Sequence, residues 1–197
     1  MGLSFHYNGR FRKEASLPGL INEVKDIADV CKWKYRIFSS EFPENFSNEN
    51  EHNGEIYGIS ITPPECESVF FCFLSNGRMS NPFLVKFYGE QKTARDKEFL
   101  YMVSTKTQFA GIEVHKFIIQ LFKHLQKQNY FEELNIIDEG EYWETGDEKN
   151  LETIFNRYDK LLDDFSLALK SVPKNDGESF DNYFERIVKK IDKRRTN

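Results

Sequence analysis

Along this chain, the apolar residues recur at the spacing of a strand in some segments and at the spacing of a helix in others. Residues 3–11 carry aromatic side chains at alternating positions, which predicts a first strand. Residues 17–31 place apolar side chains three or four positions apart, with Ser16 as a cap and Pro18 in the first turn. This second pattern predicts an amphipathic helix that covers a sheet with one face.

Segments with a period of two follow this helix and predict further strands. The predicted strands span residues 33–37, 55–62, 68–75, 82–88, 98–105 and 134–137. Residues 41–54 are rich in acidic and Asn residues, which predicts an exposed loop. The other connections are short and contain turn formers such as Asn76-Gly77. Consecutive strands should therefore be antiparallel, because a parallel crossover needs a dozen or more residues.

Helical spacing returns in residues 111–128, which carry apolar side chains around most of the predicted helix. A long helix is predicted from Thr145, whose distance of three residues from Glu148 is that of a capping box, to about residue 172. Residues 173–177 break this helix, and a last helix is predicted over residues 180–191. The short connection predicts a C-terminal helical hairpin.

The order of these elements predicts an α+β fold. We expect a curved antiparallel β-sheet of about five to seven strands, with helices packed on one face and a C-terminal helical hairpin. A chain of 197 residues is long enough for one substantial core, so we expect a single domain over residues 1–197. Within it, residues 1–138 should form the sheet and two helices, and residues 139–197 the hairpin packed on them.

Composition narrows the class of protein. Aromatic residues make up 15% of the chain, which favours a closely packed core over disorder. The net charge of −5 gives no general attraction to nucleic acid or to anionic membranes. There is no apolar run of membrane-helix length and no signal-peptide pattern at the start, so we expect a soluble, cytoplasmic protein. Cys31, Cys66 and Cys72 form no CxxC pair, so we expect buried thiols and neither a disulfide nor a zinc site.

The densest polar segment, residues 138–148, is called the acidic loop below. It contains six carboxylates, which suit a site for a divalent cation or, alternatively, the negatively charged start of a helix. Tyr142 and Trp143 lie inside it, either as anchors that hold the loop on the protein or as an exposed recognition surface. The capping and anchoring interpretations are favoured. Tyr142, Trp143, Glu141 and Glu144 are nevertheless the best candidates for binding residues.

The other motifs indicate no specific chemistry. His115 lies on the apolar face of its helix, where a histidine is usually a core residue satisfied by a hydrogen bond. No histidine has metal-ligand spacing, and no phosphate-binding loop or nucleophile elbow occurs. We therefore expect no catalytic residue, metal or cofactor. The last turns of the final helix contain cations that suit the negative end of the helix dipole. They are Lys189, Lys190, Lys193, Arg194 and Arg195.

These observations favour a non-catalytic protein-binding module, of which a protein that neutralises a basic toxin is one example. Two alternatives stay open: a small-ligand-binding domain that uses the concave side of the sheet, and a metal-assisted hydrolase that uses the acidic loop. The first class is preferred because it needs no chemistry that the sequence lacks. The residues expected at the centre of the core are Ile118, Phe122, Phe155, Tyr158 and Phe165.

Overall fold

The computed structural model describes residues 2–43, 51–90 and 92–195, with side chains described up to residue 191. The strands are β1 (Ser4–Phe11), β2 (Lys34–Ile37), β3 (Tyr57–Thr62), β4 (Val69–Phe73), β5 (Val103–Lys106) and β6 (Phe131–Asp138). The helices are α1 (Leu17–Cys31), α2 (Pro82–Tyr88), α3 (Ala94–Phe99), α4 (Ile112–Lys127), α5 (Tyr142–Thr145), α6 (Glu148–Ser171) and α7 (Phe180–Arg195). The fold is therefore α+β, as predicted.

The described strands form two antiparallel sheets of three strands each, with orders β5-β1-β6 and β2-β3-β4. Isolated contacts join the sheets: the Phe70 amide donates to the Tyr7 hydroxyl at 2.8 Å, and the Thr105 hydroxyl donates to the Ser68 carbonyl at 3.1 Å. Because these contacts do not continue into a ladder, the single sheet of five to seven strands predicted from the sequence is not confirmed.

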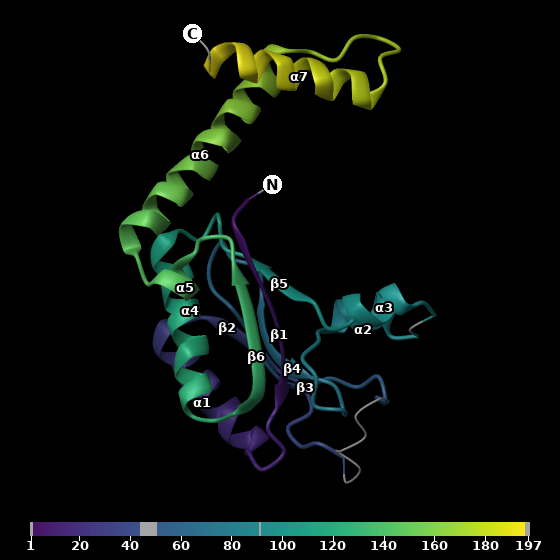
Figure 1. Cartoon of the computed structure of the whole chain (residues 1–197), viewed down its shortest axis with the longest axis vertical. Helices are drawn as coiled ribbons and strands as arrows, with labels where there is room; N and C mark the ends of the chain where they lie inside the picture. The colour runs from purple at the N-terminus through teal and green to yellow at the C-terminus, as the bar shows by residue number, and fades with distance from the viewer. Residues whose placement is uncertain (1, 44–50, 91, 196–197) are drawn as a thin grey trace.

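Helices α1 and α4 contact each other, since His124 of α4 pairs with Glu23 of α1, and both bury their apolar faces on the sheets (Figure 1). The Phe122 ring of α4 lies 4.9 Å from the Tyr7 ring of β1 and 4.7 Å from the Phe71 ring of β4. The main core thus lies where α4 meets both sheets. Of the five predicted core residues, Ile118, Phe122 and Phe155 are buried, as expected, whereas Tyr158 and Phe165 are only partly buried.

Two predicted strands are wrong. Residues 82–88 form α2, because the Asn81 side chain caps the amides of Phe83 and Leu84 and Pro82 occupies the first helical turn. Residues 98–105 are split between α3, which begins with a capping box of Thr93 and Asp96, and the shorter strand β5. In both segments the alternation of large residues suggested a strand, but a capping side chain starts a helix there instead.

Other boundaries differ by a few residues. Strand β6 is longer than predicted, and α6 is capped by Asp147 rather than Thr145, which instead ends the short helix α5. The predicted exposed loop at 41–54 lies partly outside the described residues, as do the side chains of Lys193, Arg194 and Arg195.

Helix α6 leaves the body of the protein, and α7 crosses its far end (Figure 1). The first turns of α6 contribute Leu151 and Phe155 to the main core. Near its end, Ala168 and Val172 form a separate small cluster with Ile187 and Ile191 of α7. In the described part of the chain, the predicted hairpin touches the body through the first half of α6, where Tyr158 packs on the main core and Asp159 accepts a hydrogen bond from Gln108 at 2.8 Å. We call α6 beyond Asp159, together with α7, the arm.

Candidate functional site

The acidic loop folds around the side chain of Asp138, which is only 5% exposed at the end of β6. Its carboxylate accepts the backbone amides of Gly140 at 2.8 Å, Tyr142 at 2.9 Å and Trp143 at 3.0 Å. Charge-assisted bonds of this kind are about twice as strong as neutral ones. Asp138 therefore shapes the turn that leads into α5.

The pKa of Asp138 reflects two opposing influences. Burial raises it, because the charged form loses hydration, but hydrogen bonds and the nearby His115 ring lower it by more. The net pKa of Asp138 lies below its usual range, so the carboxylate is ionised at neutral pH.

His115 of α4 and Thr107, which follows β5, extend this buried group. The Nε2 atom of His115 lies 3.1 Å and 3.2 Å from the two Asp138 oxygens, and its Nδ1 atom lies 2.8 Å from the Thr107 hydroxyl. Because an ionised carboxylate only accepts hydrogen bonds, Nε2 carries a proton and donates it to Asp138. In the neutral ring, Nδ1 then accepts the Thr107 proton.

A hydroxyl, an imidazole and a carboxylate in a row are also the parts of a nucleophilic relay. Here the Thr107 and His115 side chains are both 0% exposed and Asp138 is 5% exposed. A substrate has no access to the hydroxyl, and a buried His satisfied on both nitrogens is a structural feature. We call Thr107, His115 and Asp138 the polar node, and it fixes the acidic loop on α4.

Gly140 lies where the polar node meets α6. A Cβ atom at this position would come within 2.6 Å of Leu151 Cδ1, 3.0 Å of His115 Nε2 and 3.1 Å of Asp138 Oδ1. The absence of a side chain at Gly140 therefore lets the first turn of α6 pack directly on the node.

Replacing Gly140 by alanine should lower the free energy of unfolding by about 1–3 kcal/mol, because the methyl group overpacks this junction. Chemical denaturation would measure the change. Gly146→Ala does not serve as a control, since that residue has a positive φ of 65°; Asn156→Ala on the exposed face of α6 does. A Gly140→Ala variant as stable as the wild type would contradict the packing described here.

The sequence-predicted binding residues divide into a buried and an exposed part. Tyr142 is buried and its hydroxyl accepts from Gln120 at 3.3 Å, whereas Trp143 is half-buried against the core. The Lys123 ammonium lies over both rings, 5.7 Å and 5.4 Å from their centroids. Glu141 and Glu144 are exposed on the outer side of the loop. Tyr142 anchors the loop, and Trp143 keeps part of its surface accessible.

The carboxylates of the acidic loop point in different directions. Asp138 faces inward, Asp147 accepts the Lys149 and Asn150 amides at the start of α6, and Glu148 pairs with Lys116 at 2.9 Å. Among the described residues, no group of three His, Cys, Asp or Glu side chains lies close enough together to hold a metal ion. The loop geometry therefore supports the helix-capping interpretation of these acids.

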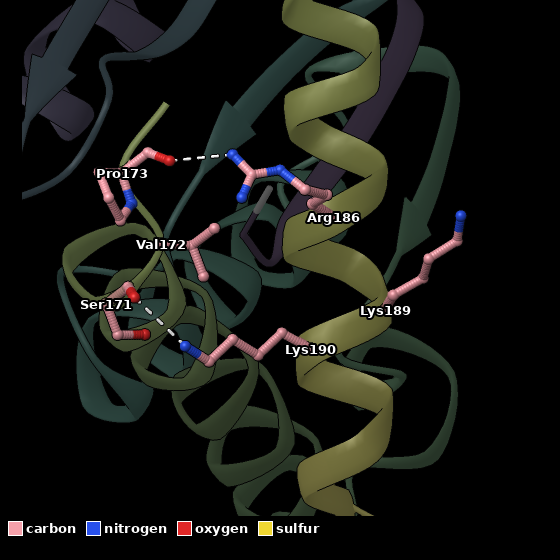
Figure 2. A pocket seen from close by; sticks show the side chains of 6 residues that line it. All are labelled: Ser171, Val172, Pro173, Arg186, Lys189 and Lys190. Carbon is pink, nitrogen blue, oxygen red and sulfur yellow. Dashed lines mark hydrogen bonds between the residues drawn. The ribbon is translucent and has the colours of Figure 1, made fainter. Parts of the chain in front are cut away.

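The junction at the far end of α6 is held by cations of α7 (Figure 2). Lys190 donates to the Ser171 carbonyl at 3.2 Å, and Arg186 donates to the Pro173 carbonyl at 2.9 Å and to Glu178 at 2.7 Å. Of the five cations that the sequence suggested as a cap of their own helix, Lys190 instead caps the end of α6, together with Arg186, which was not among them. These contacts fix how α7 crosses α6.

The arm also exposes a row of apolar side chains, which we call the tip stripe. Phe180, Phe184 and Val188 follow one another at four-residue intervals and are 66%, 40% and 49% exposed. The Phe184 ring lies 5.5 Å from the Phe180 ring and 5.8 Å from the Phe165 ring of α6. Their exposure follows from the crossing of the two helices (Figure 1).

A hollow of about 450 Å³ on the body lies between β4, β5 and α2. It is lined by Cys66, Glu67, Ser68, Phe70, Asn81, Phe83 and Ser104. In the described part of the chain, every buried side-chain nitrogen and oxygen has a hydrogen-bond partner, so no buried unpaired polar group lies beneath the hollow. Burial raises the pKa of the Cys66 thiol to about 12, so this cysteine is not activated as a nucleophile.

Comparison with protein-family models, curated proteins and solved structures finds no match to this chain. Among the described residues, no helix combines the length and the apolar character needed to cross a membrane.

Proposed function

We propose that this chain is a non-catalytic protein-binding module whose main binding element is the arm. The observation that carries the proposal is the tip stripe: three large apolar side chains exposed in a row on a helix that projects from the body. Rows of side chains at four-residue intervals are how an amphipathic helix contacts a partner. Contiguous exposed apolar surface of this kind is typical of interaction sites.

The size of the tip cluster supports the same proposal. In the described part of the chain, the buried residues of this cluster between α6 and α7 are Ala168, Val172, Ile187 and Ile191. A core this small stabilises an isolated helix pair weakly. Burial of the tip stripe by a partner would add stability at about 25 cal/mol per Å² of apolar surface.

The exposed part of the acidic loop is the second contact surface in the proposal. Trp143 offers a partly accessible ring, and Glu141 and Glu144 give its surroundings a negative charge. Acidic side chains around an aromatic contact favour association with a basic partner and speed its approach. Neutralisation of a basic toxin is one function of this class.

The proposal places the protein in the cytoplasm as a single domain over residues 1–197, with a protein partner and no nucleic acid. The free thiols of Cys31, Cys66 and Cys72 suit a reducing compartment. The net charge of −5 opposes binding to the phosphate backbone.

The alternatives have weaker support. The hollow between β4, β5 and α2 is the observation that favours a small-ligand-binding domain, but it presents no unpaired buried polar group among the described residues. A metal-assisted hydrolase would need converging ligands, and the acids of the loop diverge.

The proposal predicts that, in a lysate of the cells that make this protein, the chain is bound to a partner through the arm. The wild-type chain should elute from a sizing column as a species larger than one chain, and Phe180→Glu should shift it to the size of a single chain. The reason is that a carboxylate at this exposed position opposes burial of the tip stripe.

The matched control is Phe87→Glu, which makes the same change on α2 at a side chain that is 71% exposed, against 66% for Phe180. It should leave elution unchanged, and both variants should melt close to the wild type. If the wild-type chain elutes alone, or if both variants behave alike, the arm is not the binding element.

A further inference from the structure

The tip stripe and the acidic loop lie at opposite ends of α6, a helix of 24 residues. At a rise of 1.5 Å per residue, this helix is about 36 Å long. The two surfaces are therefore held apart within one chain. The inference below rests on the proposed function and names the partner of these two surfaces.

The charges of the two surfaces are complementary. The sequence of α7 contains six basic and three acidic residues, a net charge of +3. The acidic loop contains six carboxylates and no basic residue, and all of them except Asp138 belong to exposed residues. The Lys123 ammonium lies 5.4 Å from the Trp143 ring centroid, but the five exposed carboxylates of the loop outnumber this one cation. A basic helix with an apolar stripe is therefore the partner that this surface would recognise.

Helix α6 itself carries an incompletely covered apolar seam. Apolar residues recur at alternating intervals of four and three: Ile154, Tyr158, Leu161, Phe165, Ala168 and Val172. The body covers the start of this seam and α7 covers its end. Between the two covered parts, Leu161 of the seam is half-buried; beside the seam, Leu162 is half-buried and Leu169 is 38% exposed. This spacing is that of helices that pack side by side in coiled coils.

We propose that the partner is a second copy of this chain, bound through antiparallel pairing of the two α6 helices. Because both arms have the same length, such pairing places the tip of each copy beside the base of the other. The tip stripe and positive charge of one α7 then meet Trp143, Glu141 and Glu144 of the other copy. The contact occurs twice around a two-fold axis, so the assembly closes as a dimer.

Sedimentation equilibrium of the purified full-length chain tests the proposal. The mass should rise from one chain toward two chains with concentration and stop at two. Glu144→Lys and Lys189→Glu should each weaken the dimer by about tenfold or more, since each reversal brings like charges together at both contacts. Combined in one chain, they should recover much of the affinity, because the opposite charges then face each other again.

The control is Lys97→Glu, which reverses an exposed charge on α3, away from both surfaces, and should leave the dimer unchanged. Thermal melting of each variant at a concentration where it is monomeric checks that it remains folded. Phe180→Glu should also give a monomer, through loss of the apolar contact.

Each outcome decides between the proposals. A purified chain that stays monomeric at every concentration overturns the dimer, and an arm-dependent assembly in the lysate would then leave the proposed function standing. A dimer that resists Phe180→Glu and both charge reversals also overturns this inference, because its interface lies elsewhere. A chain that is single in the purified state and in the lysate removes both proposals.

Discussion

Replacement of Asp138 by asparagine is expected to lower the free energy of unfolding by about 3–5 kcal/mol at pH 7, because several hydrogen bonds to a buried charged group, each worth about 1.5–3 kcal/mol, are lost or weakened together. The carboxylate accepts three backbone amides and the His115 Nε2 proton. An amide nitrogen at one of these acceptor positions would face another donor, so several bonds are lost together. Urea denaturation of the variant measures the loss.

The same variant should change the acid dependence of stability. The pKa of Asp138 is depressed in the folded protein, so its contribution is fully present above the unfolded carboxyl pKa of about 3.9. This contribution is lost as the pH falls through the lower, folded pKa. The gap in stability between wild type and Asp138→Asn should therefore narrow in the acid range.

Asp163→Asn is the control, since it removes a carboxylate from an exposed position on α6 and should change stability little. If Asp138→Asn were within about 1 kcal/mol of the wild type at pH 7, or if its gap to the wild type widened in acid, the polar node would not have the structural role derived above.

Phe122→Ala should also lower the free energy of unfolding by about 3–5 kcal/mol, as truncation of a buried aromatic residue does. Its ring contacts Phe5 and Tyr7 of one sheet and Phe71 of the other, so the cavity would open where the sheets meet. The partly exposed Phe117 on the same helix provides the comparison: Phe117→Ala should cost clearly less. Equal losses for the two variants would argue against a core centred on Phe122.

The long amphipathic helices α1, α4 and α6 could be predicted from sequence because their apolar spacing is sustained over several turns. Helix α2 could not be recognised from spacing alone, since Phe83, Val85 and Phe87 also alternate as in a strand. The decisive information was local, in the Asn81 cap and the following proline. Short helices are set by their first turn more than by their periodicity.

The polar node was only half predictable. His115 was expected to be a satisfied core residue, but Asp138 was grouped with the exposed acids of the loop. A signal was present: in a strand, Asp138 shares its face with Ile136, which is buried. A carboxylate on the buried face of a strand and a histidine on the buried face of a helix each require a partner. When one chain contains two such residues, each is the candidate hydrogen-bond partner of the other.

For the arm, the apolar spacing predicts a helix but not which of its faces is buried. Two adjacent rows of apolar side chains follow α7, one of them Tyr183, Ile187 and Ile191 and the other the tip stripe. Either row is equally suited to pack on α6, and the loop between the helices determines which one does. Sequence periodicity indicates how much of a helix is apolar, but the crossing of its neighbour determines what remains exposed.

The position of β1 has a consequence for synthesis on the ribosome. This first strand is central in its sheet, and both of its neighbours, β5 and β6, are translated about a hundred residues later. By contrast, α1 and the β2-β3-β4 sheet are complete by Phe73. The emerging chain must therefore keep the apolar residues of β1 unpaired until Lys106 has left the exit tunnel, and without their second neighbour until Asp138 has. Such a delay lengthens the period in which this segment can pair wrongly.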